Sequence, residues 1–329
     1  MILKAKPEDE YWRRAESGAT YVDEIQLIKY PDSATCFMDL EVGNIDMCPV
    51  ENADYSRFLR EGSDDYDCVL IPIGSVMNFY FSTQNLPEIW GNKRYREAVA
   101  YGVDWVQVSK NAVEDRYIQA LGVCPTSSPN FLDTGWDELP YDPDLAKEIM
   151  TELGYGPNNM LKLHAVSAST ETAKVTMETI QFYLKEMYMD LSLEFLDTSA
   201  SLEAQNQVGV PGIVDLGVTY TRRGSVASRM RESIKYNSQK TPSLSYINDD
   251  RYQELFFDLT YSYDLADRDA AMEEIQRYNR EELFIIPMYE VAEGFAYRTD
   301  RLRPEHITSY FNSRSMIQLT RLVMLPAWE

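Results

Sequence analysis

The chain has 329 residues, is 44% hydrophobic and 12% aromatic, and carries a formal charge of −22 from 31 basic and 53 acidic residues. This length is enough for two domains, or for one large domain with an appendage. A surface so acidic repels phosphate groups, which argues against nucleic acids and anionic lipids as the main partners.

Cysteine and histidine usage gives little support to a metal site. No CxxC pair is present, and the two histidines lie far apart in the sequence. Four cysteines in so long a chain do not make a disulfide scaffold, so mostly buried thiols are expected. A bridge from Cys36 to Cys48 or to Cys68 stays open. The cysteines are Cys36, Cys48, Cys68 and Cys124, and the histidines are His164 and His306.

The first ninety residues alternate short predicted strands with short predicted helices. Pro31-Asp32-Ser33 marks a turn and a helix start, and Gly43 is typical of the end of that helix. Pro72 and Gly74 interrupt the next apolar stretch, so two separate strands are expected there. Strands are predicted at 21–28, 45–48, 68–73 and 76–83, and a second helix at 52–59.

Residues 92–113 carry the recognisable pattern of an amphipathic helix. Asn92 suits the N-cap, and Gly102 interrupts the pattern at a cost of about 1 kcal/mol relative to alanine. Either the helix breaks at Gly102 or another backbone passes close to it. The apolar positions, which recur every three to four residues, are Ala98, Val99, Val103, Val106 and Val113.

From residue 141 to residue 220, predicted helices and strands alternate. Asp142 and Pro143 suit the start of a helix, and residues 170–189 form a regular one. This alternation favours an α/β fold, because parallel strands need crossover helices between them. Strands are predicted at 161–166, 191–196, 213–220 and 284–289, and further helices at 202–208, 226–236, 250–261 and 267–282. Pro287 should confine the last strand to an edge or a bulge.

Catalytic signatures are missing from the sequence. It contains no GxSxG elbow, no P-loop and no GxGxxG after a strand. His164 falls in a predicted strand and His306 in the irregular tail, and neither has a serine or cysteine at interpretable spacing. We therefore assign no catalytic residue, no metal ligand and no cofactor, and expect structural roles for both histidines.

A pair of arginines comes directly after the predicted strand 213–220. Arg222 and Arg223 precede Gly224 at the exit of this strand and the entry of a helix, where α/β folds place ligands. Paired guanidinium groups grip a carboxylate or phosphate by two-pronged hydrogen bonds, and a helix N-terminus adds partial positive charge. A solvent-exposed basic turn that balances nearby acids is the alternative interpretation.

The order of several segments resembles the oligopeptide/dipeptide/nickel type of bacterial extracellular solute-binding proteins, family 5, which serve ABC importers. The clearest segment is 94–104, RYREAVAYGVD, which is similar to the family's "rVRqAlayAiDR". The other matching segments are Tyr11-Trp12 with 21–25 ("YW … vDeI"), 40–46 ("L-x-x-G-x-x-D"), 79–86, 141–155 ("yDpekAkeLLaeAGY") and 268–287 ("R…eeiqr…e…iPly").

The resemblance implies a type II periplasmic-binding-protein-like α/β fold with a ligand enclosed between two lobes and no catalysis. Residues 1–75 would be part of the first lobe, 76–284 the complete second lobe, and 285–329 the return into the first lobe. Family members carry a long stretch before the "YW … vDeI" segment, so the resemblance also predicts that this chain is truncated. The N-terminus has no secretory signal and no apolar run approaches the roughly 20 residues of a membrane span.

The resemblance also places a ligand site on the crossing strand and on the loop after residue 220. The expected ligand-binding residues are Tyr80, Ser82, Tyr220, Thr221, Arg222 and Arg223. Two positions depart from the family pattern. The loop has arginines where peptide binders often carry a tryptophan and an aspartate, and Ser82 stands where asparagine is common. A carboxylate-bearing solute is therefore as plausible a ligand as a peptide.

The implied partners are a small-molecule or peptide ligand and ABC permease subunits, with no nucleic acid and with membrane contact only through a missing N-terminal anchor. The full-length protein would be an extracytoplasmic monomer, in the periplasm or anchored at the cell surface. A cytosolic ligand-sensing or interaction domain derived from the same fold is the alternative. An α/β enzyme is a weaker third option, because no nucleophile–base pair is visible.

Overall fold

The computed structural model describes residues 2–4, 24–128, 130–205, 207, 212–220, 247 and 249–302. The chain forms two compact units. Unit 1 comprises residues 1–73, 114–116 and 292–329, and unit 2 comprises 74–113 and 117–291. Two long strands, β4 (Tyr66–Phe81) and β8 (Ile285–Arg298), run from one unit into the other.

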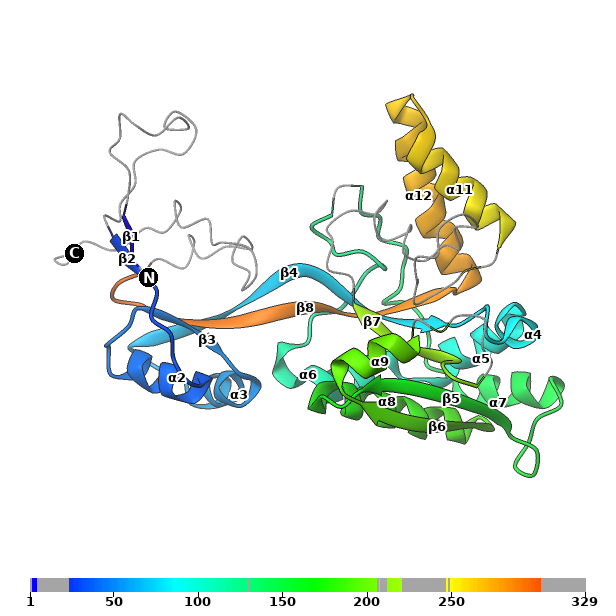
Figure 1. Ribbon diagram of the computed structural model, residues 1–329, viewed down its shortest axis with the longest axis horizontal. Helices are drawn as coiled ribbons and strands as arrows, with labels where there is room; N and C mark the ends of the chain where they lie inside the picture. The colour runs from blue at the N-terminus through cyan, green and yellow to red at the C-terminus, as the bar shows by residue number, and fades with distance from the viewer. Residues whose placement is uncertain are drawn as a thin grey trace. The chain divides into compact units, whose positions relative to one another are not determined.

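Unit 1 is a small α/β assembly in which helices α2 and α3 lie beside a sheet (Figure 1). Asp32 caps α2 by accepting from the Thr35 amide at 2.8 Å, which confirms the predicted helix start. Within this unit β8 lies between β3 and β4, with Cys48 opposite Ala296. The further elements are β1 (Ile2–Lys4), β2 (Glu24–Gln26), α2 (Ser33–Glu41), β3 (Met47–Val50), α3 (Asn52–Glu61) and η2 (Glu114–Arg116).

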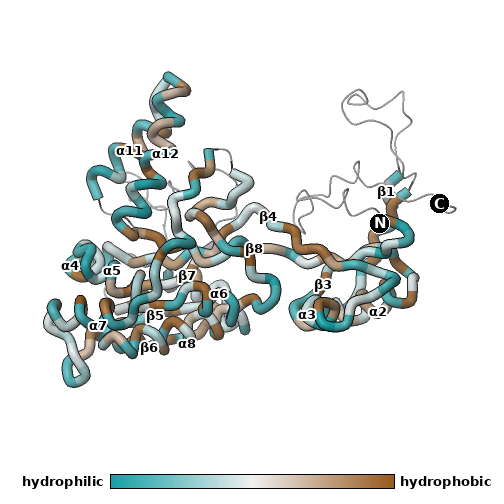
Figure 2. Tube along the Cα trace, turned by 180° about the vertical axis from the view of Figure 1, so that it is seen from behind, coloured by the Kyte–Doolittle hydropathy of each residue, from teal (hydrophilic) through white to brown (hydrophobic). Residues whose placement is uncertain are grey.

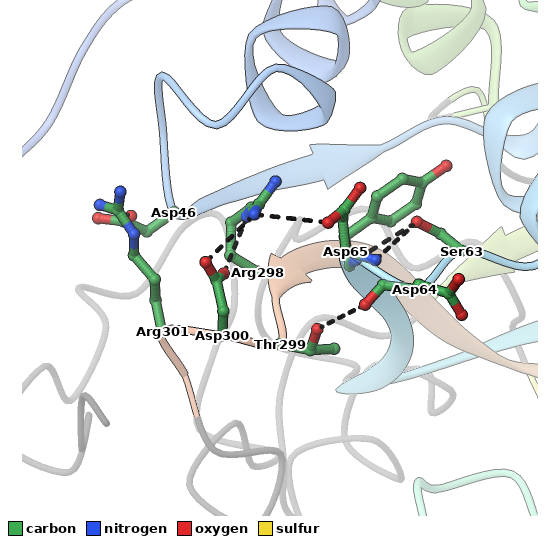
Figure 3. Close-up of polar contacts among 9 residues, drawn as sticks. Asp46, Ser63, Asp64, Asp65, Arg298, Thr299, Asp300 and Arg301 are labelled. Carbon is green, nitrogen blue, oxygen red and sulfur yellow. Dashed lines mark hydrogen bonds and ion pairs between the residues drawn. The ribbon is translucent and has the colours of Figure 1, made fainter. Parts of the chain in front are cut away.

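A polar network fastens the end of β8 in unit 1 (Figure 3). Arg298 binds Asp300 through two hydrogen bonds of 3.0 and 3.2 Å, and its amide donates to the Asp46 carbonyl. Thr299 donates through its amide to the Asp65 carbonyl and through its hydroxyl to the Asp64 carbonyl. Asp300 contributes its carboxylate to this network, whereas Asp46, Asp64 and Asp65 contribute backbone carbonyls. These aspartates therefore stabilise unit 1.

Unit 2 contains the α/β layer that the sequence pattern predicts. Strands β5 (Leu161–Ala168) and β6 (Met189–Leu196) are parallel, with Leu161 opposite Met189. Helix α8 (Glu171–Glu186) connects them and packs on both. The helices change between hydrophilic and hydrophobic colours along their length in Figure 2, as amphipathic helices do. The remaining elements are α4 (Pro87–Trp90), α5 (Lys93–Gly102), α6 (Trp105–Val113), α7 (Pro143–Glu152), α9 (Thr198–Gln205), β7 (Leu216–Tyr220), α11 (Asp250–Tyr261) and α12 (Leu265–Glu282).

The expectation of two strands around Pro72 and Gly74 is wrong, because β4 runs unbroken from Tyr66 to Phe81. Among the described strands, β7 pairs only with residues 77–81, so β4 has β8 as its one neighbour over its first half. Proline is tolerated there because an edge strand leaves one row of amides unpaired. Gly74 has a φ of +68°, a conformation open to glycine, so the strand bends there and continues.

Pro287 stands inside β8 and at a local edge, as predicted. Strand β3 pairs only with residues 294–297 of β8, and at Tyr289 the same strand makes an isolated bridge with Gln119. The predicted helix 226–236 lies outside the described residues.

The helix predicted at 92–113 is two helices that meet at Gly102. Asn92 caps α5, accepting from the Arg94 amide at 3.0 Å. The alternatives at Gly102 both hold in part: the helix breaks there, and a close neighbour is present, although that neighbour is side chain. A methyl group on Gly102 would stand 2.8 Å from Cβ of Ala146 and would overlap Cε of Met187.

Arg96 is the buried charge around which unit 2 is assembled, with 1% of its surface exposed. Its guanidinium donates to the Trp90 carbonyl at 2.6 Å, and to the carbonyl and carboxylate of Glu282 at 2.8 and 3.0 Å. The Phe284 ring lies against its face, 4.5 Å from the guanidinium carbon. Burial lowers the pKa of Arg96, and Glu282 opposes that shift.

We expect Arg96→Ala to lower the free energy of unfolding by about 3 kcal/mol, because the change removes one partner of a buried ion pair. Glu282 retains Lys93 at 3.5 Å, which keeps the loss from being larger. Denaturant unfolding followed by circular dichroism measures the difference. Arg94→Ala is the control: Arg94 has a 45% exposed side chain and ion pairs with Glu97 and Glu152 at the surface, so the loss should stay below about 1 kcal/mol. Equal losses in the two variants would contradict this role.

Gly102→Ala should destabilise the protein by about 1–3 kcal/mol, because the new methyl group overlaps Ala146 and Met187 in the core. Gly156→Ala is the matched control, since no atom lies within 4 Å of the methyl group that it adds. The two variants are compared by thermal unfolding. A Gly102→Ala protein as stable as the control would show that the core of unit 2 accepts the added volume.

Candidate functional site

The expected ligand loop follows strand β7 in the sequence. Strands β4 and β7 are antiparallel, with Tyr80 opposite Gly217 and Met77 opposite Tyr220. Strand β7 ends at Tyr220. Its partner on β4, Met77, comes three residues after Gly74, the first residue of unit 2 on that strand. The backbone of Tyr220 is described, whereas Thr221, Arg222 and Arg223 lie outside the described residues.

Tyr80 lies in the interior of unit 2, with 1% of its surface exposed. Its ring covers Gly217, where an added methyl group would stand 2.7 Å from the tyrosine oxygen. Val166 and Val214 pack against the ring. The hydroxyl has no hydrogen-bond partner in the described structure, and burial raises its pKa. Tyr80 thus packs against strand β7 at Gly217.

Ser82 lies at the other end of the β4–β7 ladder and is also buried. Its amide donates to the Asp215 carbonyl at 3.0 Å, and its carbonyl accepts from the Asn85 amide at 3.1 Å. The Asp215 carboxylate accepts from the amides of His164 and Gly212 at 2.8 and 3.2 Å. The structure brings Tyr80 next to β7 but does not bring Ser82 and Tyr220 together.

His164 has the structural role expected of it. Nδ1 hydrogen-bonds to the Ile213 carbonyl at 2.7 Å, so Nδ1 carries the proton, and Nε2 lies 4.0 Å from a carboxylate oxygen of Glu194. Neither partner is a hydroxyl or thiol nucleophile. Within the described ranges, no group of three or more His, Cys, Asp or Glu side chains is placed to hold a metal ion.

A polar group that the sequence pattern does not single out lies where β4 and β8 enter unit 2. We call Asn78, Thr126, Ser128 and Glu290 the crossing-end cluster. Glu290 is 2% exposed, and its Oε1 accepts from the Thr126 amide at 2.7 Å. Asn78 is fully buried and donates to the carbonyls of Val76 and Val123 at 3.1 and 3.5 Å.

Two atoms of the crossing-end cluster lack hydrogen-bond partners in the described structure, namely Oδ1 of Asn78 and Oγ of Ser128. Buried polar atoms normally have partners, but other buried atoms in the described part of unit 2, such as Oη of Tyr80 and Oδ1 of Asn279, also lack one, so these two atoms do not by themselves mark a site. The Pro/Ser segment 122–129 was the available sequence signal, and it predicted only a loop. Glu290 gave no signal, because it lies just after the predicted strand 284–289 and matches no motif.

A polar hollow of about 540 Å³ lies elsewhere in unit 2, beside α5 and α12. Both signs of charge line it, including Glu97, Glu138 and Arg277. Arg280, also in its wall, donates to the Gly135 carbonyl and stacks on Trp136, which makes that arginine part of the scaffold. Four acidic and three basic side chains line the hollow, so its charge does not select a particular ligand class.

The solved structures that this fold resembles are periplasmic-binding proteins. A putative peptide-binding protein, AppA, from Clostridium difficile superposes with a TM-score of 0.79 at 15% sequence identity, covering 94% of this chain and 62% of that one. Likeness at this level of identity establishes the fold, which confirms the predicted type II periplasmic-binding-protein class.

The sequence establishes the family. The pattern of "Bacterial extracellular solute-binding proteins, family 5 Middle" matches residues 1–220, and the chain belongs to this family. Glutathione-binding protein GsiB of Shigella flexneri is 25% identical over 63% of this chain and 39% of its own length. Heme-binding protein A of Haemophilus influenzae is 31% identical over 46% of this chain and 26% of its own length.

The chain thus spans well under half of these curated relatives. Family members are substrate-binding proteins of ABC transporters that act outside the cytoplasm, and they are binding proteins rather than enzymes. Within the described residues, no helix of unit 1 or unit 2 combines the length and apolarity that a bilayer span needs.

The contact between Glu290 and segment 122–128 can be tested directly. Glu290→Ala removes the acceptor of the Thr126 amide, a charge-assisted bond of about 1.5–3 kcal/mol, so exchange of amide hydrogens in segment 122–128 should quicken about tenfold or more. Hydrogen–deuterium exchange with mass spectrometry reads this segment.

Glu290→Gln keeps a carbonyl oxygen and should leave most of the protection in place. Glu281→Ala, at an exposed glutamate near the end of α12, is the matched control and should change nothing in segment 122–128. Unchanged exchange in Glu290→Ala would show that the loop is held by other contacts.

Proposed function

We propose that this chain is part of the substrate-binding component of an ABC importer and captures a small carboxylate-bearing or peptide-like solute without catalysis. Membership of family 5 supports the importer role. The observation that carries the choice of site is the end of β7. Its last residue, Tyr220, lies opposite Met77, and Thr221, Arg222 and Arg223 follow Tyr220 in the sequence.

The chemistry of the loop favours an anionic group on the solute. Two adjacent arginines supply planar donors that match a carboxylate, and Tyr220 and Thr221 add polar or aromatic contacts beside them. Tyr80 and Ser82, both buried, hold the strands from which the loop emerges. The buried carboxylate of Glu290 holds segment 122–128 to β8 through the Thr126 amide.

The ligands that name the relatives agree with this chemistry. Glutathione, heme and peptides all carry carboxylates, and proteins named for binding them are similar to this chain. Membership of family 5 further supports the proposal that the full-length protein works outside the cytoplasm and delivers its solute to permease subunits. We also propose that it is a monomer and reaches the membrane through an N-terminal anchor.

The test is ligand binding by the protein as encoded, measured by thermal shift and calorimetry against glutathione, short peptides, heme and a simple dicarboxylate. A ligand that binds only the folded state raises the apparent stability. Arg222→Ala and Arg223→Ala should each weaken binding of the best carboxylate ligand about tenfold or more, because each removes a charge-assisted hydrogen bond.

Arg251→Ala is the matched control, since Arg251 is 51% exposed on α11 and pairs with Glu254 and Glu274. Binding of neutral or cationic peptides with unchanged affinity in both loop variants would overturn the carboxylate assignment. Absence of binding to every solute class would count against the importer role itself.

A further inference from the structure

Three of the four cysteines gather in one hydrophobic cluster of unit 1. Cys36 lies on α2, Cys48 on β3 and Cys68 on β4, around a core that includes Phe37 and Leu40. All three are thiols in the structure. Because the thiols come from three different elements, a bond between two of them would fasten those elements together.

Cys36 and Cys48 are the pair that the fold brings together, since both belong to this cluster and come from α2 and β3, which pack on each other. Both positions are fixed by the backbone. Asp32 caps the helix that carries Cys36, and Cys48 lies opposite Ala296 in the β3–β8 ladder. Helix α2 packs on β3. The two thiols are therefore held together by elements that are ordered for other reasons.

Cys68 is excluded as the partner of Cys48 by the order of strands. Strand β8 lies between β3 and β4, so the backbones of Cys48 and Cys68 are two strand spacings apart, about 9–10 Å. A disulfide needs Cα atoms about 4.4–6.8 Å apart. The sheet therefore makes Cys36 the partner that Cys48 can reach.

We propose that Cys36 and Cys48 form a disulfide when the protein meets a disulfide-bearing oxidant, and that this bond fastens α2 to β3. The packing of α2 on β3 in the shared cluster and the strand order carry the inference, which does not depend on the identity of the solute. Family members act outside the cytoplasm, where such oxidants are found.

The reaction is ordinary thiol–disulfide exchange. The thiolate of Cys36 attacks one sulfur of the oxidant, forms a mixed disulfide and releases one thiolate. The thiolate of Cys48 then attacks the sulfur of Cys36 and releases the second, so the protein loses two electrons and two protons and the oxidant becomes two thiols. Cys36 attacks first because it is half-buried, whereas Cys48 is buried. Burial raises the pKa of both thiols, so the exchange should be faster at alkaline pH.

The test treats the folded protein with 2-hydroxyethyl disulfide and maps the product by mass spectrometry without reduction. Cleavage after Glu41 separates the two cysteines and leaves their peptides joined only if the bond has formed. Cys68→Ser and Cys124→Ser should keep the joined peptides and the loss of two hydrogen atoms. Cys36→Ser and Cys48→Ser should each abolish both.

Oxidation should also raise the folding equilibrium constant by roughly a hundredfold, as expected for closing a loop of this size. This gain should be lost in Cys36→Ser and kept in Cys68→Ser. A bridge that involves Cys68, or a folded wild-type protein that keeps every thiol under these conditions, would overturn the proposal. Because no solute is present, neither result bears on the importer role.

Discussion

The buried guanidinium of Arg96 is the constraint on which unit 2 depends. A charge with so little exposure is tolerated only when its donors are satisfied. Those donors are met at two places far apart in the sequence, the Trp90 carbonyl and Glu282. Arg96 therefore fixes α5 against the end of α12, three residues before β8 begins at Ile285.

Because its start is held, β8 brings Tyr289 to its bridge with Gln119 and turns Glu290 toward the Thr126 amide. A shift of one residue along β8 would turn Glu290 to the other face of the strand, so the crossing-end cluster owes its position to an ion pair outside it.

Local signals were sufficient for most of the helices and for the fold class. Asp32, Asn92 and Asp142 cap the helices that the sequence assigns to them, because capping depends on neighbours within three residues. Pro72 misled the strand prediction, since its effect depends on which neighbours β4 has. At Gly102, the sequence posed the right alternatives but did not identify Met187 and Ala146 as its contacts.

The candidate site was less predictable for the same reason. Residues after β7 can be found from a strand followed by two arginines, which is a local pattern. Asn78 and Glu290 cannot be found in this way, because burial is what distinguishes them. The loop that buries them lies almost fifty residues after Asn78 and more than 160 residues before Glu290. The sequence analysis singled out neither residue, because contacts so distant along the chain leave no local pattern.

The buried acids of unit 2 hold loops to strands through backbone amides. Glu290 accepts from the Thr126 amide, and the Asp215 carboxylate accepts from the amides of His164 and Gly212. A hydrogen bond to a charged group is worth about 1.5–3 kcal/mol, more than a neutral one, so each acid fixes its loop firmly. Asp215 precedes β7, and Glu290 lies on β8, so these bonds position the strands around the loop that the proposed function assigns to the ligand.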